Sequence, residues 1–214
     1  MLPYKFKESL FKKIPIIGIL RGYTEVEVLS IIQIYKEVGF TNIEVTMNTP
    51  TALPILQAVN EQFGDDLNVG MGTVCSLEET KKAIAAGAQF IVSPITNEAS
   101  IALCKEQGVP IFPGAFSPSE IYHAWQLGAK MVKVFPSGLL GPIFIKEVLA
   151  PMNDIALMPT GGVNLTNIME YHTAGAKAFG VASLLFDKQL IQAKQWLELK
   201  HKMQVVRNKL AFLG

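Results

Sequence analysis

Short apolar runs recur along the chain, and most are followed by a longer stretch in which apolar positions return with a helical period. Continuous runs of this kind, bounded by Gly and polar residues, are typical of buried parallel strands. Eight strands are predicted in this way, over residues 16–20, 42–47, 67–71, 90–93, 110–112, 131–135, 155–158 and 177–181. Glycines recur where a helix-like stretch ends and an apolar run begins. Their spacings are one or two multiples of roughly twenty residues, which is the length of one strand, one helix and two short loops.

The segments between these strands begin with signals for a helix N-terminus. Three S/T-x-x-E capping boxes are present, formed by Thr24 with Glu27, Ser76 with Glu79 and Ser117 with Glu120. Eight alternating strand and helix units favour a (β/α)8 barrel of the α/β class. An open doubly wound sheet is the alternative, but the first strand leads into Leu20-Arg21-Gly22-Tyr23-Thr24 and not into a Gly-rich dinucleotide turn.

One domain is expected over residues 1–214. Residues 1–14 are predicted to form an extra amphipathic helix at the base of the barrel, and residues 15–183 to hold its strands. Residues 184–214 are predicted to form a closing helix or helix pair. Its expected apolar face is made of Leu190, Ile191, Trp196, Leu197 and Val205.

The composition of the chain limits the kinds of molecule that the protein is expected to bind. Half of the 214 residues are hydrophobic, the net charge is +1 and the mean hydropathy is +0.30, which suits one large core and gives no basic surface for nucleic acid. No apolar segment approaches the ~20 residues that cross a bilayer, so no membrane partner is expected. Cys75 and Cys104 are lone thiols, and the N-terminus has no signal-peptide pattern. A soluble cytoplasmic protein is expected.

A lysine stands inside the apolar run Met131-Val132-Lys133-Val134-Phe135. Strand residues alternate between two faces, so Lys133 shares its face with Met131 and Phe135. In apolar surroundings a lysine loses its proton more easily, and a neutral amine can attack a ketone. The alternative is an edge-strand lysine that reaches solvent.

A carboxylate occupies a similar position in the predicted second strand. Alternation places Glu44 and Thr46 toward the barrel interior. A buried carboxylate is costly unless it is paired, and Lys133 is the strand-borne candidate for its partner. A structural salt bridge and a catalytic function therefore both point to the pair of Glu44 and Lys133.

The ends of several predicted strands carry residues suited to binding. In a (β/α)8 barrel the active site lies at the C-terminal strand ends. Thr73 and Pro94 follow two of them, and Thr160-Gly161-Gly162 leads from another toward a helix. Two glycines before a helix expose successive backbone N–H groups that bind anions. Together with Ser183 after the last strand, they predict a phosphate site.

Other catalytic groups are sparse in the sequence. His123, His172 and His201 fall in helical stretches, and no His or Cys cluster has metal-ligand spacing. Neither a metal nor another cofactor is therefore expected, and no Ser-His-Asp arrangement is evident. The remaining set of a lysine, a glutamate, hydroxyl groups and an anion site suits carbanion chemistry through an imine.

At these residues the chain resembles the 2-keto-3-deoxy-6-phosphogluconate aldolase family, with its 4-hydroxy-2-oxoglutarate and 6-phosphogalactonate relatives. The shared motifs are Glu44-Val45-Thr46, Gly70-x-Gly72-Thr73-Val74, Ser93-Pro94, Lys133-x-Phe135-Pro136 and Pro159-Thr160-Gly161-Gly162-Val163. The resemblance spans residues 16–183. It implies a class I aldolase with Lys133 as the Schiff-base lysine and Glu44 as the general acid/base. It further implies a pyruvyl pocket lined by Thr73, Pro94 and Phe135, a phosphate site at Gly161, Gly162 and Ser183, and a homotrimer.

The chain departs from the gluconate-type pattern at one position. Such members generally carry Arg four residues after the glutamate, where this chain has Asn48. Asn cannot replace a bidentate Arg on a carboxylate, but Arg21 at the end of the first strand could supply the charge. The galactonate branch is similar here and also at Ile19-Leu20-Arg21-Gly22.

The implied reaction is cleavage of 2-keto-3-deoxy-6-phosphogluconate to pyruvate and glyceraldehyde 3-phosphate. The galactonate epimer is the alternative substrate, and 4-hydroxy-2-oxoglutarate, which would give pyruvate and glyoxylate, is a further candidate. Two other hypotheses stay open: a phosphosugar epimerase or isomerase, and a non-catalytic barrel that binds a phosphorylated ligand.

Overall fold

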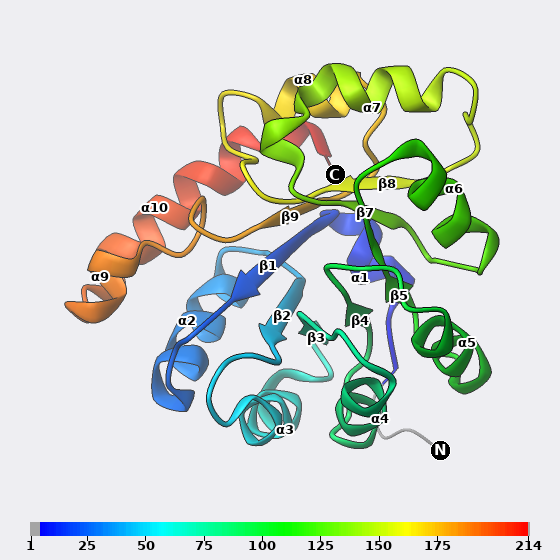
Figure 1. Ribbon diagram of the computed structural model, residues 1–214. Helices are drawn as coiled ribbons and strands as arrows, with labels where there is room; N and C mark the ends of the chain where they lie inside the picture. Colours follow the sequence, from blue (N-terminus) through cyan, green and yellow to red (C-terminus); the bar gives the residue numbers. More distant parts are fainter. Residues whose placement is uncertain (1–4, 214) are drawn as a thin grey trace.

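Strands and helices alternate along the chain in the computed structural model, which describes residues 5–213 (Figure 1). Within these residues the strands are β1 (Ile16–Leu20), β2 (Asn42–Thr46), β3 (Asn68–Gly72), β4 (Ile91–Val92), β5 (Ile111–Phe112), β6 (Gly114–Ala115), β7 (Val132–Val134), β8 (Leu157–Pro159) and β9 (Phe179–Val181). Every strand pairing is parallel. The predicted α/β class with a parallel sheet is confirmed.

The strands form two sheets. One has the order β5-β4-β3-β2-β1-β9 and the other β6-β7-β8, and a bridge between Thr160 and Gly180 links the end of β8 to β9. The predicted fifth strand is extended by a second strand, β6, beyond Pro113. Proline lacks the N–H that an uninterrupted ladder would need. Hydrogen bonds toward β7 nevertheless continue past this proline: the Lys130 N–H donates to the Ile111 carbonyl (2.9 Å) and the Lys133 N–H to the Pro113 carbonyl (2.8 Å).

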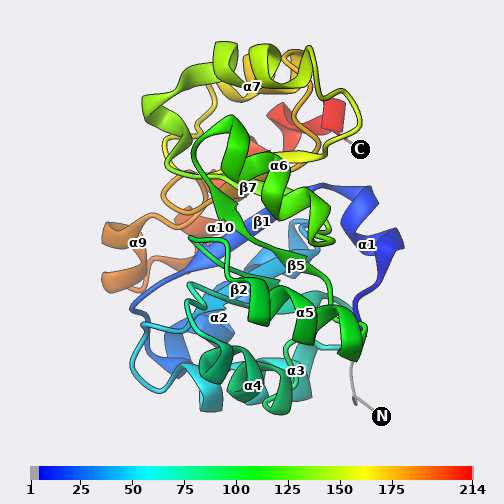
Figure 2. The ribbon, with the colours of Figure 1, turned by 45° about the vertical axis from the view of Figure 1, so that its right-hand side comes forward.

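The helices lie outside the curled strands (Figures 1 and 2). They are α1 (Glu8–Lys13), α2 (Glu25–Glu37), α3 (Ala52–Phe63), α4 (Leu77–Ala85), α5 (Glu98–Gln107), α6 (Pro118–Gln126), α7 (Gly141–Leu149), α8 (Ile168–Thr173), α9 (Lys188–Gln192) and α10 (Trp196–Lys209), with 3-10 turns η1 (Ser137–Leu139) and η2 (Ala211–Leu213). The three predicted capping boxes are confirmed at the starts of α2, α4 and α6. None of these helices is long and apolar enough to cross a membrane.

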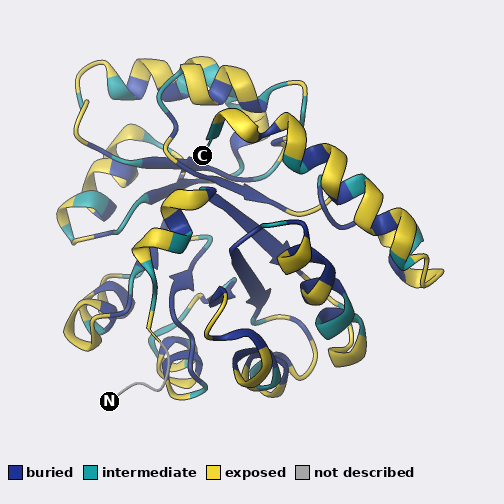
Figure 3. Ribbon diagram, turned by 180° about the vertical axis from the view of Figure 1, so that it is seen from behind, coloured by how far each residue is buried: buried dark blue, intermediate teal, exposed yellow. Residues whose placement is uncertain are grey.

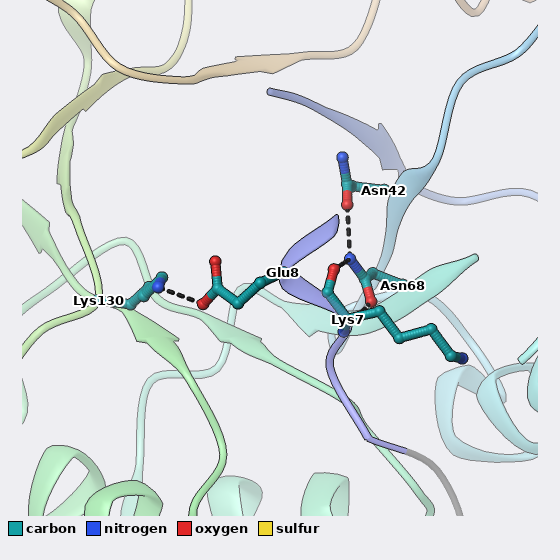
Figure 4. Close-up of polar contacts among 5 residues, drawn as sticks. All are labelled: Lys7, Glu8, Asn42, Asn68 and Lys130. Carbon is teal, nitrogen blue, oxygen red and sulfur yellow. Dashed lines mark hydrogen bonds and ion pairs between the residues drawn. The ribbon is translucent and has the colours of Figure 1, made fainter. Parts of the chain in front are cut away.

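The N-terminal segment closes one end of the strands (Figure 4). The Asn68 side chain accepts a hydrogen bond from the Lys7 N–H (2.7 Å) and donates to the Lys7 carbonyl (2.9 Å) and to Asn42 Oδ1 (2.8 Å). Glu8 forms an ion pair with Lys130. Asn42 and Asn68 are the first residues of β2 and β3, so α1 covers the N-terminal strand ends.

The strands are buried and the helices expose their outer faces, as Figure 3 shows in dark blue and yellow. A cluster enclosed by the strands consists of Phe11, Ile17, Phe90, Val92, Phe112, Met158 and Ala178, with Met131 packed against it. Met131 precedes Lys133 by two residues and shares its strand face. The apolar interior therefore continues directly to the lysine.

The C-terminal segment forms a helix pair, but its predicted apolar face is partly wrong. Ile191 is buried as expected, whereas Leu197 is 81% exposed and Val205 is 40% exposed. Lys194 adopts a left-handed conformation (φ 54°) between α9 and α10, which resets the helical phase. The buried face of α10 is made of Leu199, Met203 and Val206.

Candidate active site

Lys133 lies in the middle strand of the β6-β7-β8 sheet and is only 3% exposed. The edge-strand alternative is therefore wrong. Burial lowers the pKa of its amine; Glu44 opposes this effect, and the charge of Arg21 adds to it. The amine Nζ lies 5.0 Å from the centroid of the Phe135 ring. The residue has the surroundings of an amine that gives up its proton readily.

Glu44 lies in β2 and is 1% exposed. Burial raises its pKa to about 7, although Lys133 and Arg21 each act in the opposite direction. Its Oε2 has no hydrogen-bond partner within the described part of the chain. Gly72 provides the room for this carboxyl group, because a Cβ there would stand 2.1 Å from Oε1.

Glu44 and Lys133 are near enough to shift each other's pKa, yet no direct ion pair joins them among residues 5–213. The salt bridge that would have explained both residues structurally is therefore not formed. A buried carboxyl oxygen without a hydrogen-bond partner destabilises the fold. Such groups are found most often at functional sites.

A cavity of about 370 Å³ lies over the ends of β1, β7, β8 and β9. Seven of the predicted site residues line it: Arg21, Lys133, Phe135, Thr160, Gly161, Gly162 and Ser183. Lys133 thus shares one cavity with the predicted phosphate site.

The turn after β8 exposes backbone N–H groups. Gly161 and Gly162 have φ angles of 84° and 83°, in the left-handed region that favours glycine. The N–H groups of Gly161, Gly162, Val163 and Ser183 donate to no acceptor among residues 5–213. Successive free N–H groups at a concave surface are suited to binding a phosphate.

Four predicted site residues do not line this cavity: Glu44, which is buried in β2, and Thr73, Pro94 and Asn48. Thr73 follows β3 with φ 57°, and its Oγ1 accepts a hydrogen bond from Arg21 Nη2 at 3.4 Å. Pro94 lines a neighbouring cavity of about 350 Å³ that shares Phe135 with the first. Asn48 is exposed after β2 and lines neither cavity. Arg21, not Asn48, is thus the polar group that the fold brings to Lys133.

The family model described as KDPG and KHG aldolase matches residues 7–202. The chain belongs to this aldolase family.

Relatives of this aldolase carry both substrate names. The chain is 33% identical to the 2-dehydro-3-deoxy-6-phosphogalactonate aldolase of Escherichia coli, over 81% of this chain and 85% of that protein. It is 42% identical to the 2-dehydro-3-deoxy-phosphogluconate aldolase of Treponema pallidum, over 62% and 63%. The structure of a KDPG aldolase from Legionella pneumophila holds pyruvate captured at low pH as a covalent carbinolamine intermediate. It matches with 26% identity and a TM-score of 0.85, over 92% of this chain and 96% of that one.

Two residues near the aldolase site were not named as site residues from the sequence, although Gly180 stands in the Gly-x-x-Ser segment that ends at Ser183. Gly180 lines the cavity, and a Cβ there would lie 2.4 Å from Thr160 Oγ1. A glycine within an apolar strand was the available signal. Cys75, taken as an isolated thiol, contributes to the electrostatic surroundings of Lys133. In the described part of the aldolase no group of three or more His, Cys, Asp or Glu residues is arranged to hold a metal ion.

Proposed function

We propose that the protein is a class I keto-acid aldolase in which Lys133 forms the Schiff base and Glu44 moves the protons. One observation carries this proposal: a lysine that is 3% exposed, coupled to a buried carboxyl group, lines the same cavity as a nest of free N–H groups. A structural lysine would not need either neighbour.

The proposed reaction begins when the neutral Lys133 amine adds to the C2 ketone of the substrate. Glu44 protonates the hydroxyl group of the carbinolamine, which leaves as water and gives an iminium ion. Glu44 then removes the C4 hydroxyl proton, directly or through water, and the electrons of the C3–C4 bond pass to the iminium nitrogen. An aldehyde leaves, the enamine is protonated at C3, and water releases pyruvate and restores the amine.

The electrostatics support this division of roles. Burial favours the neutral amine that attacks the ketone. A carboxyl group with a pKa of about 7 both accepts and donates a proton near neutral pH without a large free-energy cost. The covalent carbinolamine in the Legionella pneumophila relative is the intermediate that the first step would produce.

For the substrate we propose 2-keto-3-deoxy-6-phosphogluconate, cleaved to pyruvate and glyceraldehyde 3-phosphate. The free N–H groups after β8 and the Ser183 hydroxyl would hold its phosphate, and Arg21 its carboxylate. The galactonate epimer remains the alternative, because relatives of both names are similar to this chain. Unphosphorylated 4-hydroxy-2-oxoglutarate would leave the phosphate site empty.

Pyruvate release from the gluconate- and galactonate-derived substrates, measured with the same enzyme, tests the proposal. We expect release from the gluconate-derived substrate and its loss in Lys133→Met, which should still bind inorganic phosphate. A phosphosugar epimerase or isomerase would release no pyruvate. A non-catalytic phosphate-binding barrel would be unaffected by Lys133→Met.

We also propose that the two sheets close into one eight-membered barrel, with β5 and β6 as one interrupted strand, in a single domain. The Thr160–Gly180 bridge and the pairing of β1 with β9 support this closure. The homotrimer implied by the resemblance stays a prediction that light scattering would check. A cytoplasmic location fits a metabolic aldolase.

A further inference from the structure

The N–H groups of Gly161, Gly162, Val163 and Ser183, free of protein acceptors among residues 5–213, are called the phosphate nest. A second turn packs against it. The 3-10 turn η1 follows β7, and its backbone runs against the turn after β8. The Ser137 N–H donates to the Thr160 carbonyl (2.9 Å), and the Gly138 N–H donates to the Gly161 carbonyl (2.7 Å). The Ser137 hydroxyl donates to the same Gly161 carbonyl at 2.8 Å. One carbonyl oxygen of the nest therefore accepts two hydrogen bonds from η1.

Tyr171 of α8 extends this arrangement. Its hydroxyl donates to the Ser137 carbonyl at 2.8 Å. Tyr171 is 1% exposed and Ser137 is fully buried. Neither side chain is among the described residues that line the cavity, so neither is placed to touch a substrate.

The two turns also touch through their backbones. A Cβ on Gly162 would lie 2.7 Å from Gly138 Cα, so a side chain at Gly162 would force the turns apart. The Gly162 carbonyl is held separately, by the side-chain amides of Asn164 (3.2 Å) and Asn167 (2.9 Å).

Peptide planarity connects these bonds to the nest. In a trans peptide the C=O of one residue points opposite to the N–H of the next. Holding the Gly161 carbonyl toward η1 therefore aims the Gly162 N–H away from η1. In the same way, the hydrogen bonds from Asn164 and Asn167 to the Gly162 carbonyl fix the direction of the Val163 N–H. Both N–H groups are free of protein acceptors within residues 5–213.

We propose that Ser137 and Tyr171 are positioning residues that orient the phosphate nest by holding the Gly161 carbonyl. The proposal rests on the proposed function, in which this nest binds the substrate phosphate. Ser137 follows Lys133 by only four residues, so the same segment fixes both the reacting amine and the nest. The pair would thus set affinity for the phosphate end of the substrate without affecting imine formation at the other end.

The test compares Ser137→Ala and Tyr171→Phe with two matched controls. Ser100→Ala removes a buried hydroxyl that bonds Thr80 between α4 and α5 (2.8 Å), and Tyr35→Phe removes a buried hydroxyl that donates to the Asn42 carbonyl (2.6 Å). Four quantities are measured for each: KM and kcat for the gluconate-derived substrate, the Kd for inorganic phosphate by titration calorimetry, and the extent of pyruvate trapping by borohydride.

We expect Ser137→Ala to raise both the KM and the Kd for phosphate about five- to tenfold, the usual effect of one hydrogen bond in a buried network. Tyr171→Phe should shift both in the same direction, and it keeps the ring that fills the core. Pyruvate trapping should stay at the wild-type level in both variants. The two controls should leave all four quantities unchanged.

Two results would overturn the proposal. Unchanged phosphate affinity in both variants would mean that the nest is oriented without Ser137 and Tyr171. A loss of pyruvate trapping in proportion to phosphate affinity would indicate general damage to the fold. Phosphate titration needs no turnover, so a wild-type protein that fails to trap pyruvate would refute the aldolase chemistry while still giving a separate result for the two positioning residues.

Discussion

Lys133 lowers the pKa of Glu44 and Glu44 raises the pKa of Lys133, so each favours the charged form of the other. Burial has the opposite effect on both pKa values and is the larger cause. The pair therefore differs from a surface salt bridge, in which both groups are charged. The carboxyl pKa rises to about 7 while the amine pKa falls, so the free energies of the charged and neutral pairs approach each other. Proton transfer at low cost is what imine chemistry requires.

Glu44→Gln should change how stability depends on pH. The folded-state pKa of Glu44 is about 7, against 4.5 for an unperturbed glutamate. The folded state thus keeps a proton that the unfolded state loses, and the wild type loses about 3 kcal/mol as pH rises from 4.5 through 7. Glutamine carries no such charge. Measured by urea unfolding, the stability of the variant relative to wild type should improve by about this amount between pH 4.5 and 8.

An exposed glutamate supplies the control for that measurement. Glu61 lies on the outer surface of α3, and Glu61→Gln, measured in the same way, controls for the loss of one glutamate charge from an exposed position. A stability difference for Glu44→Gln that does not vary between about pH 4.5 and 8 would contradict the elevated pKa.

Arg21 and Asn48 should differ in their effect on catalysis. Arg21 lines the cavity with Lys133 and donates to Thr73, whereas Asn48 is exposed and lines neither cavity. Loss of a charged hydrogen bond costs about 1.5–3 kcal/mol, so Arg21→Gln should lower kcat/KM for pyruvate release about ten- to a hundredfold. Asn48→Ala should change it less than about twofold. A larger effect at Asn48 would show that this residue, despite its position, meets the substrate.

Phe11→Ala should destabilise the fold, because Phe11 packs α1 against the N-terminal ends of the strands. Phe11 is 2% exposed, and its ring centroid lies 5.5 Å from that of Phe6 and 5.7 Å from that of Phe112. Removing a buried phenyl ring costs about 3–5 kcal/mol. Phe212, which is 36% exposed, gives the comparison, and Phe212→Ala should cost less than about 1 kcal/mol. Equal losses in chemical denaturation would mean that α1 contributes little to the core.

Local rules were sufficient for much of the fold and for the catalytic pair. Apolar runs located the strands to within about two residues, and the capping boxes located three helix starts, because both depend on neighbours in the chain. The period of a strand also predicted that Lys133 and Glu44 face inward, and both are buried.

Features that depend on distant contacts were not predicted. The left-handed position between α9 and α10 is occupied by Lys194 and not by a glycine, so the sequence gives no signal for the turn. The exposure of Leu197 was missed for this reason. Tyr171 and Ser137 meet across 34 residues, and only the folded chain shows their hydrogen bond. Asn48 was expected at the substrate from its position in a motif, and this stays a prediction, although Asn48 is not among the residues that line the cavity with Lys133.

Reduction by borohydride in the presence of pyruvate tests the central claim most directly. Trypsin cleaves after Lys130 but not after a modified Lys133, so the added mass of one reduced pyruvate should appear on the peptide 131–146. Neither Lys133→Met nor wild type without pyruvate should carry it. A wild-type protein that gains no mass, or that gains it on another lysine, would contradict imine formation at Lys133.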